Sequence, residues 1–182
     1  KIKKIKLFHI STDEVYGSIE KGDFKENDAY EPSSPYSASK GSIDLIATSF
    51  NKTFETNIKI LNLTNNYGPY QFPEKFIPNL IFHFLKNKKA PIYGNGKNIR
   101  EWMFVEDSCN AIWKTVTSKK KFQKINIGSG IRNSNLEIAK MVFNIMKSKN
   151  LTNLDSNNFL KMVKDRPGHD KRYALNSNFF NK

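Results

Sequence analysis

Two short segments of the sequence carry side chains whose types and spacing could move protons. Thr12, Asp13 and Glu14 place a hydroxyl beside two adjacent carboxyl groups, and Tyr36 and Lys40 stand four residues apart. Adjacent acids in different environments can serve as one acid and one base, because their pKa values are driven apart. If Tyr36 and Lys40 share a helix face, the Lys40 charge should favour the phenolate and lower its pKa. Alone, the acid pair is more often the start of a polar turn, and the Tyr36–Lys40 pair is more often an exposed first helical turn.

The elements that must position these side chains are readable from the apolar pattern. Residues 5–11 predict a buried strand that ends at the acid pair, and residues 58–64 predict a second strand. Between them, Ser33-Ser34-Pro35 supplies the cap and first turn of a helix. Strand, helix, strand indicates a parallel crossover unit, whose carboxyl edge is where α/β folds place active sites. The helix is expected to bury a stripe made of Ile43, Ile46, Ala47, Phe50 and Phe54.

The second half of the chain predicts further alternation of helices and strands. The expected elements are an amphipathic helix over 76–85, a strand at 91–93, a helix capped by Asp107, a strand over 125–128 and a helix from Ser134 to Met146. Ser134 with Glu137 is a capping-box pair. Residues 150–158 are polar and predict a loop.

Composition favours an enzyme or a basic binding protein with a packed core. Hydrophobic residues make up 38% of the 182 residues, and no apolar run approaches the roughly 20 residues that a membrane helix needs. The net charge of +13 allows a nucleic-acid or other anion-binding module as an alternative. Because the lysines are scattered, we expect a solvated surface and no nucleic-acid or membrane partner. The single cysteine, Cys109, is compatible with the cytoplasm and is expected to be a core thiol; no metal-ligand spacing is present.

The nine glycines contain no G-x-G-x-x-G turn of the kind that holds a dinucleotide pyrophosphate. Either no dinucleotide binds, or that turn belongs to a part of the protein upstream of Lys1.

Taken in order, the motifs resemble the extended short-chain dehydrogenase/reductase family, in its nucleotide-sugar 4,6-dehydratase branch. The segments that carry the resemblance are 9–17 (HISTDEVYG), 34–40 (SPYSASK), 65–69 (NNYGP), 72–75 (FPEK), 91–94 (PIYG), 100–102 (REW), 126–128 (NIG) and 165–170 (DRPGHD). The acid pair separates this branch from the related nucleotide-sugar epimerases, which remain the alternative together with dehydratases for another nucleotide.

The resemblance implies an α/β fold: the C-terminal part of a Rossmann-like parallel sheet over residues 1–70, then most of a smaller α/β substrate-binding domain over 71–182. The resemblance leaves open that some segments within 71–182 return to the Rossmann-like sheet. It also implies that a glycine-rich βαβ half precedes Lys1 and that the chain stops short of the family's usual end. We therefore expect the isolated chain to bind NAD weakly and to be inactive, and the complete protein to be a homodimer.

The resemblance further implies roles for individual residues in an NAD-dependent dehydration of a nucleotide-diphosphate sugar, dTDP-glucose. Thr12, Asp13, Glu14, Tyr36 and Lys40 are the implied catalytic residues. Tyr36, Lys40 and Asn66 are the implied NAD contacts. The implied substrate contacts are Thr12, Asn65, Lys75, Phe76, Pro91, Ile92, Tyr93, Arg100, Asn126, Asp165, Arg166, Pro167, Gly168 and His169.

Overall fold

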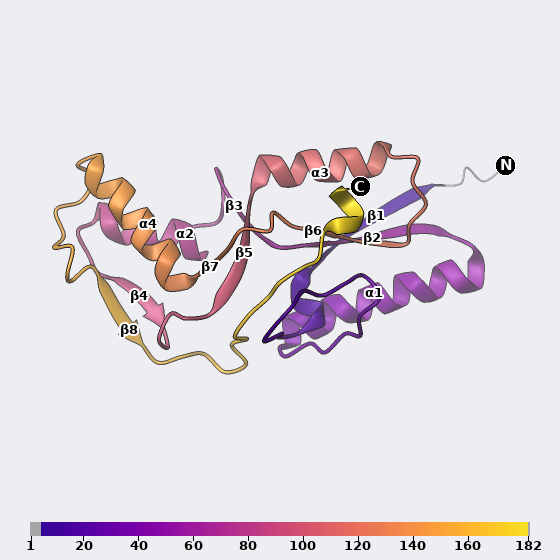
Figure 1. Ribbon diagram of the computed structural model, residues 1–182, viewed down its shortest axis with the longest axis horizontal. Helices are drawn as coiled ribbons and strands as arrows, with labels where there is room; N and C mark the ends of the chain where they lie inside the picture. Colours follow the sequence, from indigo (N-terminus) through magenta and orange to yellow (C-terminus); the bar gives the residue numbers. More distant parts are fainter. Residues whose placement is uncertain (1–4, 182) are drawn as a thin grey trace.

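The computed structural model describes residues 5–181 as an α/β molecule with mostly parallel strand pairing. Strands β1 (Lys6–Thr12), β2 (Asn57–Leu63) and β6 (Lys124–Ile127) form a parallel sheet in the order β1-β2-β6. Helix α1 (Pro35–Phe54) makes the predicted crossover between β1 and β2. Figure 1 shows α1 on one side of these strands and α3 (Val105–Thr117) on the other.

A second group of elements lies at the left of Figure 1. Strands β4 (Ala90–Tyr93) and β8 (Leu160–Val163) pair in parallel. Helices α2 (Phe76–Leu85) and α4 (Asn135–Ser148) pack together beside them. Their core contains Phe84 and other fully buried apolar side chains from all three of α2, β4 and α4.

Short strands join the two groups. Strand β5 (Ile99–Phe104) pairs in parallel with β3 (Asn65–Tyr67) and antiparallel with β7 (Arg132–Ser134). The remaining elements are the 3-10 turn η1 (Asp13–Tyr16) and the short helix α5 (Asn178–Asn181). Strand β6 and helix α5 come after the second group begins in the chain but pack in the first group, where α5 contacts β6.

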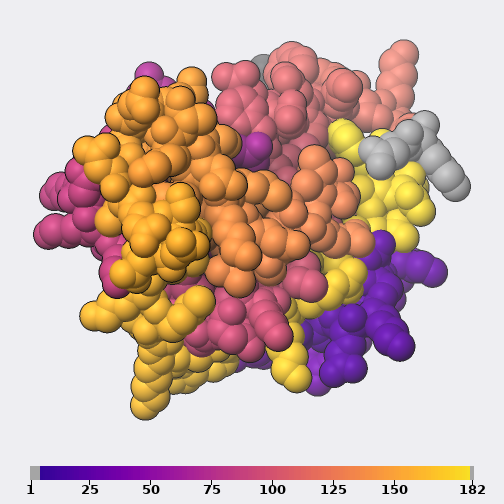
Figure 2. Space-filling model, turned by 60° about the vertical axis from the view of Figure 1, so that its left-hand side comes forward, coloured from indigo at the N-terminus to yellow at the C-terminus, as the bar shows by residue number. Residues whose placement is uncertain are grey.

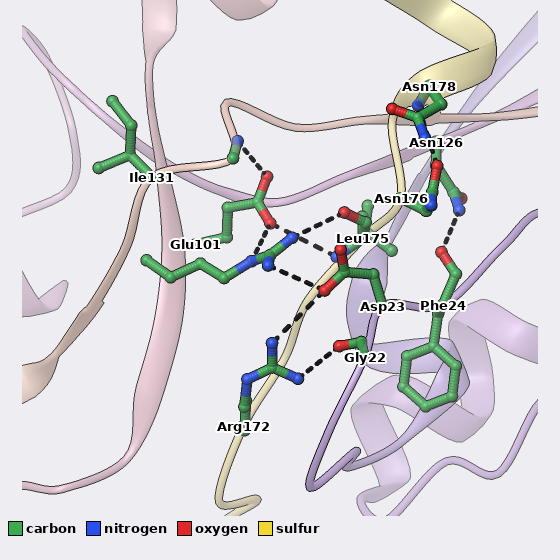
Figure 3. Close-up of polar contacts among 12 residues, drawn as sticks. Gly22, Asp23, Phe24, Glu101, Asn126, Ile131, Arg172, Leu175, Asn176 and Asn178 are labelled. Carbon is green, nitrogen blue, oxygen red and sulfur yellow. Dashed lines mark hydrogen bonds and ion pairs between the residues drawn. The ribbon is translucent and has the colours of Figure 1, made fainter.

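The C-terminal segment packs against a loop from the start of the chain, as Figure 2 shows on the face where yellow and indigo residues meet. Phe24 N donates to Ala174 O at 2.9 Å, and Asn176 N donates to Phe24 O at 2.8 Å. Figure 3 shows the charged side chains that support this contact. Asp23 faces Arg132 at 2.8 Å and Arg172 at 3.4 Å, so one carboxylate joins two later segments.

The capping signals in the sequence are confirmed. Ser34 caps α1: its Oγ accepts from Ser37 N and its N donates to Ser37 Oγ, at 3.1 Å each. Ser134 and Glu137 form the predicted capping box at the start of α4. The helix predicted to begin at Asp107 instead begins at Val105, so Asp107 lies in its first turn. Strands β5 and β8 were not predicted from the pattern.

The buried stripe predicted for α1 is wrong except at Ala47. Ile43, Ile46, Phe50 and Phe54 are all at least 44% exposed. The face that packs against the sheet carries small or polar residues instead, because the helix approaches the strands closely. These buried residues are Ser37, Gly41, Asp44 and Ala47.

The aromatic cluster in α4 offers a direct test of the second core. Phe143 is 1% exposed, and its ring stacks on Phe159 with centroids 4.1 Å apart. We expect Phe143→Ala to lower the free energy of unfolding by about 3–5 kcal/mol, because it leaves a cavity. The matched variant on the same helix, Ile145→Ala, removes a side chain that is 56% exposed and should change stability by about 0.5 kcal/mol or less. Urea unfolding of both variants measures the difference, and equal losses would contradict the assigned core.

Candidate functional site

A cleft of about 640 Å³ opens at the carboxyl ends of β1 and β2. The cleft brings together candidates from five separate parts of the sequence. Those that line it are Thr12, Asp13, Glu14, Tyr36, Asn65, Asn66, Lys75, Arg166, Pro167 and Gly168. The crossover β1–α1–β2 explains why the residues after β1 and after β2 meet, because parallel strands end at the same edge of the sheet.

The turn after β1 gives the two adjacent acids different surroundings. Thr12 Oγ1 accepts from Glu14 N at 3.3 Å and lies 3.2 Å from Asp13 Oδ1, which tightens the chain into η1. The turn closes at Gly17, which has a φ of 82°; a Cβ there would meet Glu31 O at 2.3 Å. As a result Asp13 points inward and is 2% exposed, whereas Glu14 is only partly buried.

Burial, together with the Glu14 charge, raises the pKa of Asp13 from 3.8 to about 8. The Thr12 hydrogen bond and Arg100 oppose this shift, and Glu101 reinforces it. Burial also raises the pKa of Glu14, but the positive charges of Arg100, Arg166 and Lys75 act against it. One acid is therefore set to hold a proton at neutral pH, and its neighbour faces cations that favour the carboxylate.

Tyr36 and Lys40 lie on the first turns of α1, but they do not interact as the sequence suggested. Lys40 Nζ donates to Ile10 O at 2.7 Å, within β1. The pKa of Tyr36 is raised, first by burial and then by the charges of Glu14 and Asp13. The expected lowering of this pKa is wrong, because burial and the acid pair raise the pKa of Tyr36 while the Lys40 ammonium is engaged by Ile10 O.

Several acceptors at the cleft have no hydrogen-bond partner within residues 5–181. Asp13 Oδ2, Thr64 Oγ1, Asn65 Oδ1 and Gln71 Oε1 are all buried in this way. The neighbouring Asn66 side chain is instead held in place, since it donates to Thr64 O at 3.1 Å and accepts from Ser108. These atoms are shielded from the open space of the cleft and are unsatisfied polar groups in its walls.

One wall of the cleft comes from the distant segment 165–173. Its conformation is set by Asp170, whose carboxylate accepts from Ser33 and Tyr173. Asp165 faces His169 Nδ1 at 2.6 Å, and this contact lowers the pKa of Asp165. Gly168 lies against the chain just before α1, where a Cβ would be 3.1 Å from Ser33 O. Arg166 and Pro167 line the same cleft as Tyr36.

The structure does not bring every predicted substrate contact to the cleft. Ile92 is 1% exposed and belongs to the α2–α4 core. Asn126 is fully buried and its side chain is used by Tyr16 OH and Phe24 O, at 3.0 Å each. Arg100 lies behind the wall: its guanidinium stacks 4.2 Å from the Tyr173 ring and donates to Asp170 O.

Asp165 and His169 pair with each other beside the cleft without lining it, and three more predicted contacts lie around the second group of elements. Phe76 stacks on Trp102 with centroids 6.0 Å apart. Pro91 and Tyr93 belong to β4, and Tyr93 is 50% exposed. The turn after Tyr93 approaches Asp165, because a Cβ on Gly94 would lie 2.6 Å from its Oδ2.

Sequence reasoning missed Gln71 and Tyr173, which also line the cleft. Gln71 lies four residues before the predicted contact Lys75, and this closeness in sequence was the available signal that it belongs to the site. Tyr173 resembles an ordinary core residue in the apolar run Tyr-Ala-Leu, and only its contact with Asp170 distinguishes it. Cys109 was expected in the core but is exposed.

Within residues 5–181, no cluster of three or more His, Cys, Asp or Glu side chains could hold a metal ion. None of the helices described in that range is long and apolar enough to cross a membrane.

Residues 1–181 match the family described as GDP-mannose 4,6 dehydratase. A probable dTDP-glucose 4,6-dehydratase from Sinorhizobium fredii is 41% identical over 173 residues, covering 94% of this chain and 49% of that protein. The dTDP-glucose 4,6-dehydratase 1 of Escherichia coli is 38% identical over 187 residues, covering 97% and 52%. The chain thus spans about half the length of the curated relatives it matches.

Solved structures agree with these relatives. The dTDP-glucose 4,6-dehydratase of Bacillus anthracis, in complex with NAD, superposes with a TM-score of 0.88 at 37% identity, covering 97% of this chain and 54% of that one. The UDP-glucuronic acid 4-epimerase of Bacillus cereus, in complex with UDP-glucuronic acid and NAD, has a TM-score of 0.86 at 28% identity, with coverages of 97% and 54%. Both likenesses confirm the predicted α/β fold.

The raised pKa of Asp13 predicts a pH-dependent stability. Between about pH 4 and pH 8 the folded chain keeps a proton that the unfolded chain releases. The contribution of Asp13 to stability is therefore complete below about pH 4 and is lost as the pH rises through about 8. We expect Asp13→Asn, which cannot ionise, to gain stability relative to the unsubstituted protein across this range.

Urea unfolding at a series of pH values measures the effect. Asp155→Asn serves as the control, because Asp155 is exposed and the amide keeps the oxygen that accepts from Asn157 N. A difference between Asp13→Asn and the unsubstituted protein that stays constant from pH 4 to pH 8 would show that this carboxyl is not held protonated.

Proposed function

Since the chain belongs to the family described as GDP-mannose 4,6 dehydratase, we propose that it supplies the catalytic residues of an NAD-dependent nucleotide-sugar 4,6-dehydratase acting on dTDP-glucose. The observation that carries this proposal is the acid pair, with Asp13 buried and Glu14 turned toward cations. Elimination of water from a sugar needs a base and an acid on one small ligand, which is what this pair offers.

In the proposed reaction, Tyr36 removes the proton of the sugar 4-hydroxyl and Thr12 hydrogen-bonds the same oxygen. Oxidation at C4, for which NAD would accept the hydride, gives a ketone that acidifies the proton on C5, and Glu14 removes that proton. Asp13 protonates the departing 6-hydroxyl, and its raised pKa supports this role because the proton is present at neutral pH. Lys40, four residues after Tyr36 on the same helix, is proposed to support the phenolate once a ligand displaces its contact with Ile10 O.

The residues around Tyr36 fit the nicotinamide end of NAD. Tyr36, on α1, is 55% exposed at the cleft. The fixed side chain of Asn66, on β3, lines the same cleft. NAD, when bound, supplies reversible hydride transfer at C4 and C6 of the sugar. Tyr36, Lys40 and Asn66 would hold it, whereas no glycine-rich turn for its pyrophosphate is among the residues of the chain.

Cationic side chains support recognition of the substrate diphosphate. Lys75 is 60% exposed and lines the cleft together with Arg166. Arg166 suits a diphosphate because its guanidinium offers paired donors. Arg100 does not line the cleft. Its charge opposes the rise in the pKa of Glu14, and its guanidinium donates to Asp170 O in the segment that forms one wall.

We further propose that the complete protein is a homodimer in the cytoplasm. The exposed face of α1 supports pairing, because a row of large apolar side chains on one helix is rarely left in water. This face comprises Ile43, Ile46, Phe50 and Phe54. An exposed free thiol at Cys109 is typical of a reducing compartment.

The mass of the product tests the reaction type. Complete protein with NAD and dTDP-glucose should convert the sugar nucleotide to a product lighter by one water, as measured by mass spectrometry. UDP-glucose and GDP-mannose are the comparison substrates for nucleotide choice. A product of unchanged mass would favour the epimerase alternative, and no conversion of any of the three would contradict the proposal.

Substitutions separate the roles of the two clusters. Tyr36→Phe should slow the first oxidation, so no reduced nicotinamide accumulates in a single turnover. Glu14→Gln should allow that oxidation but block removal of the C5 proton, so the reduced-nicotinamide absorbance should rise and decay slowly. Both variants should lower kcat by about 10²–10⁴-fold.

The controls are Tyr70→Phe and Glu74→Gln, which make the same chemical changes at exposed positions and should retain full activity. The division of roles is wrong if Tyr36→Phe accumulates reduced nicotinamide like the unsubstituted protein while Glu14→Gln does not.

A further inference from the structure

Helix α1 carries Tyr36 and Lys40, yet none of its large apolar side chains is buried against the neighbouring strand β1. Its large apolar side chains, such as Leu45 and Ile46, are 64% and 55% exposed. The face against the sheet is small or polar. Burial of hydrophobic surface therefore contributes little to fixing how far along β1 this helix sits, and polar contacts must set that position.

Two polar contacts join α1 to consecutive residues of β1. Lys40 Nζ donates to Ile10 O at 2.7 Å, and Ser11 Oγ donates to Asp44 Oδ2 at 2.7 Å. The first contact uses a side chain that the proposed reaction recruits, so it cannot serve as a permanent anchor. The second is enclosed, because Ser11 is 5% exposed and Asp44 1%.

Asp44 is also held on its other sides. Tyr30 OH donates to the same oxygen at 2.8 Å, and His9 Nε2 lies 3.1 Å from Oδ1. The carboxylate therefore gathers groups from β1, the following loop and α1 at one buried point. Asp44 Oδ1 has no hydrogen-bond partner among residues 5–181, but Oδ2 accepts from Ser11 and Tyr30, and movement of the helix would leave these two hydroxyls unpaired.

The position of Asp44 relates this point to the chemistry. Ser11 directly precedes Thr12 and the acid pair, and Asp44 lies about two helical turns after Tyr36 on the same element. The Ser11–Asp44 bond thus connects the strand end that carries the acids with the helix that carries the tyrosine.

We propose that Asp44 is a positioning residue that fixes the distance between Tyr36 and the Thr12–Asp13–Glu14 turn. This inference rests on the proposed function for its catalytic consequence. Because a displacement of about 1 Å can cost about 10²-fold in rate, loss of the contact should lower kcat far more than it raises KM.

The test uses complete protein with NAD and dTDP-glucose, and compares Asp44→Ala with Asp44→Asn. The alanine variant removes the acceptor and should lower kcat by about 10–100-fold while KM changes by about threefold or less. The asparagine variant keeps an oxygen for Ser11 and Tyr30, so it should restore kcat to within about fivefold of the unsubstituted protein.

The matched control is Asn51→Ala, at the far end of the same helix. Asn51 joins α1 to β2 through Ile58, with bonds of 2.7 and 2.9 Å, so its loss also destabilises the helix but away from the acids. Asn51→Ala should leave kcat nearly unchanged at temperatures where all variants are folded. Equal kcat losses in Asp44→Ala and Asn51→Ala would overturn the proposal, and so would an asparagine variant as slow as the alanine one.

Amide hydrogen exchange gives a readout that does not need activity. Asp44→Ala should speed exchange at residues 10–14 and 36–41, whereas Asn51→Ala should speed it at 51–60. If this pattern appears in a protein that converts no nucleotide sugar, the proposed function fails and the positioning contact stands. If the protein is active but Asp44→Ala leaves exchange at 10–14 unchanged, the positioning role fails alone.

Discussion

The fully buried carboxylate of Glu101 is the contact on which the arrangement of this molecule depends. It accepts from Gly130 N at 2.8 Å, Arg132 Nε at 3.1 Å and Leu175 N at 3.4 Å (Figure 3). One charge on β5 thus joins β7 and the C-terminal segment, and Arg132 extends the network to Asp23. Removing one partner from such a buried ion pair typically costs about 3–5 kcal/mol, since the other charge is left without compensation. The two groups of elements consequently meet in one geometry.

That geometry also defines the chemistry of the cleft. The C-terminal segment held at Leu175 carries Tyr173 and the wall at 165–170, so the cleft is closed by residues far from the sheet edge in sequence. The Glu101 charge adds to the burial that raises the pKa of Asp13. The interaction that organises the fold therefore also helps to keep the proposed acid protonated, whereas Glu14, one residue on, faces the cations of the wall.

Comparison of particular elements shows how far sequence patterns reach. The caps at Ser34 and Ser134 were predictable because a short polar side chain satisfies helix amides locally. The apolar stripe of α1 was assigned to the core because periodicity shows which residues share a face but not what covers that face. Strand β5 escaped prediction, because its sequence, Ile-Arg-Glu-Trp-Met-Phe, places two charged residues in a strand that is buried along most of its length.

The sequence by itself determined the side chains available for chemistry, their order, the crossover that carries two of the clusters, and the family. Tertiary structure decided which of those side chains meet. Asp13 is buried and Glu14 only partly so, Lys40 contacts a strand carbonyl, and Ile92 and Asn126 serve the packing. The physical reason is that a pKa, an exposed fraction or a cleft wall depends on groups brought together from distant parts of the chain, and residue spacing records only local neighbours.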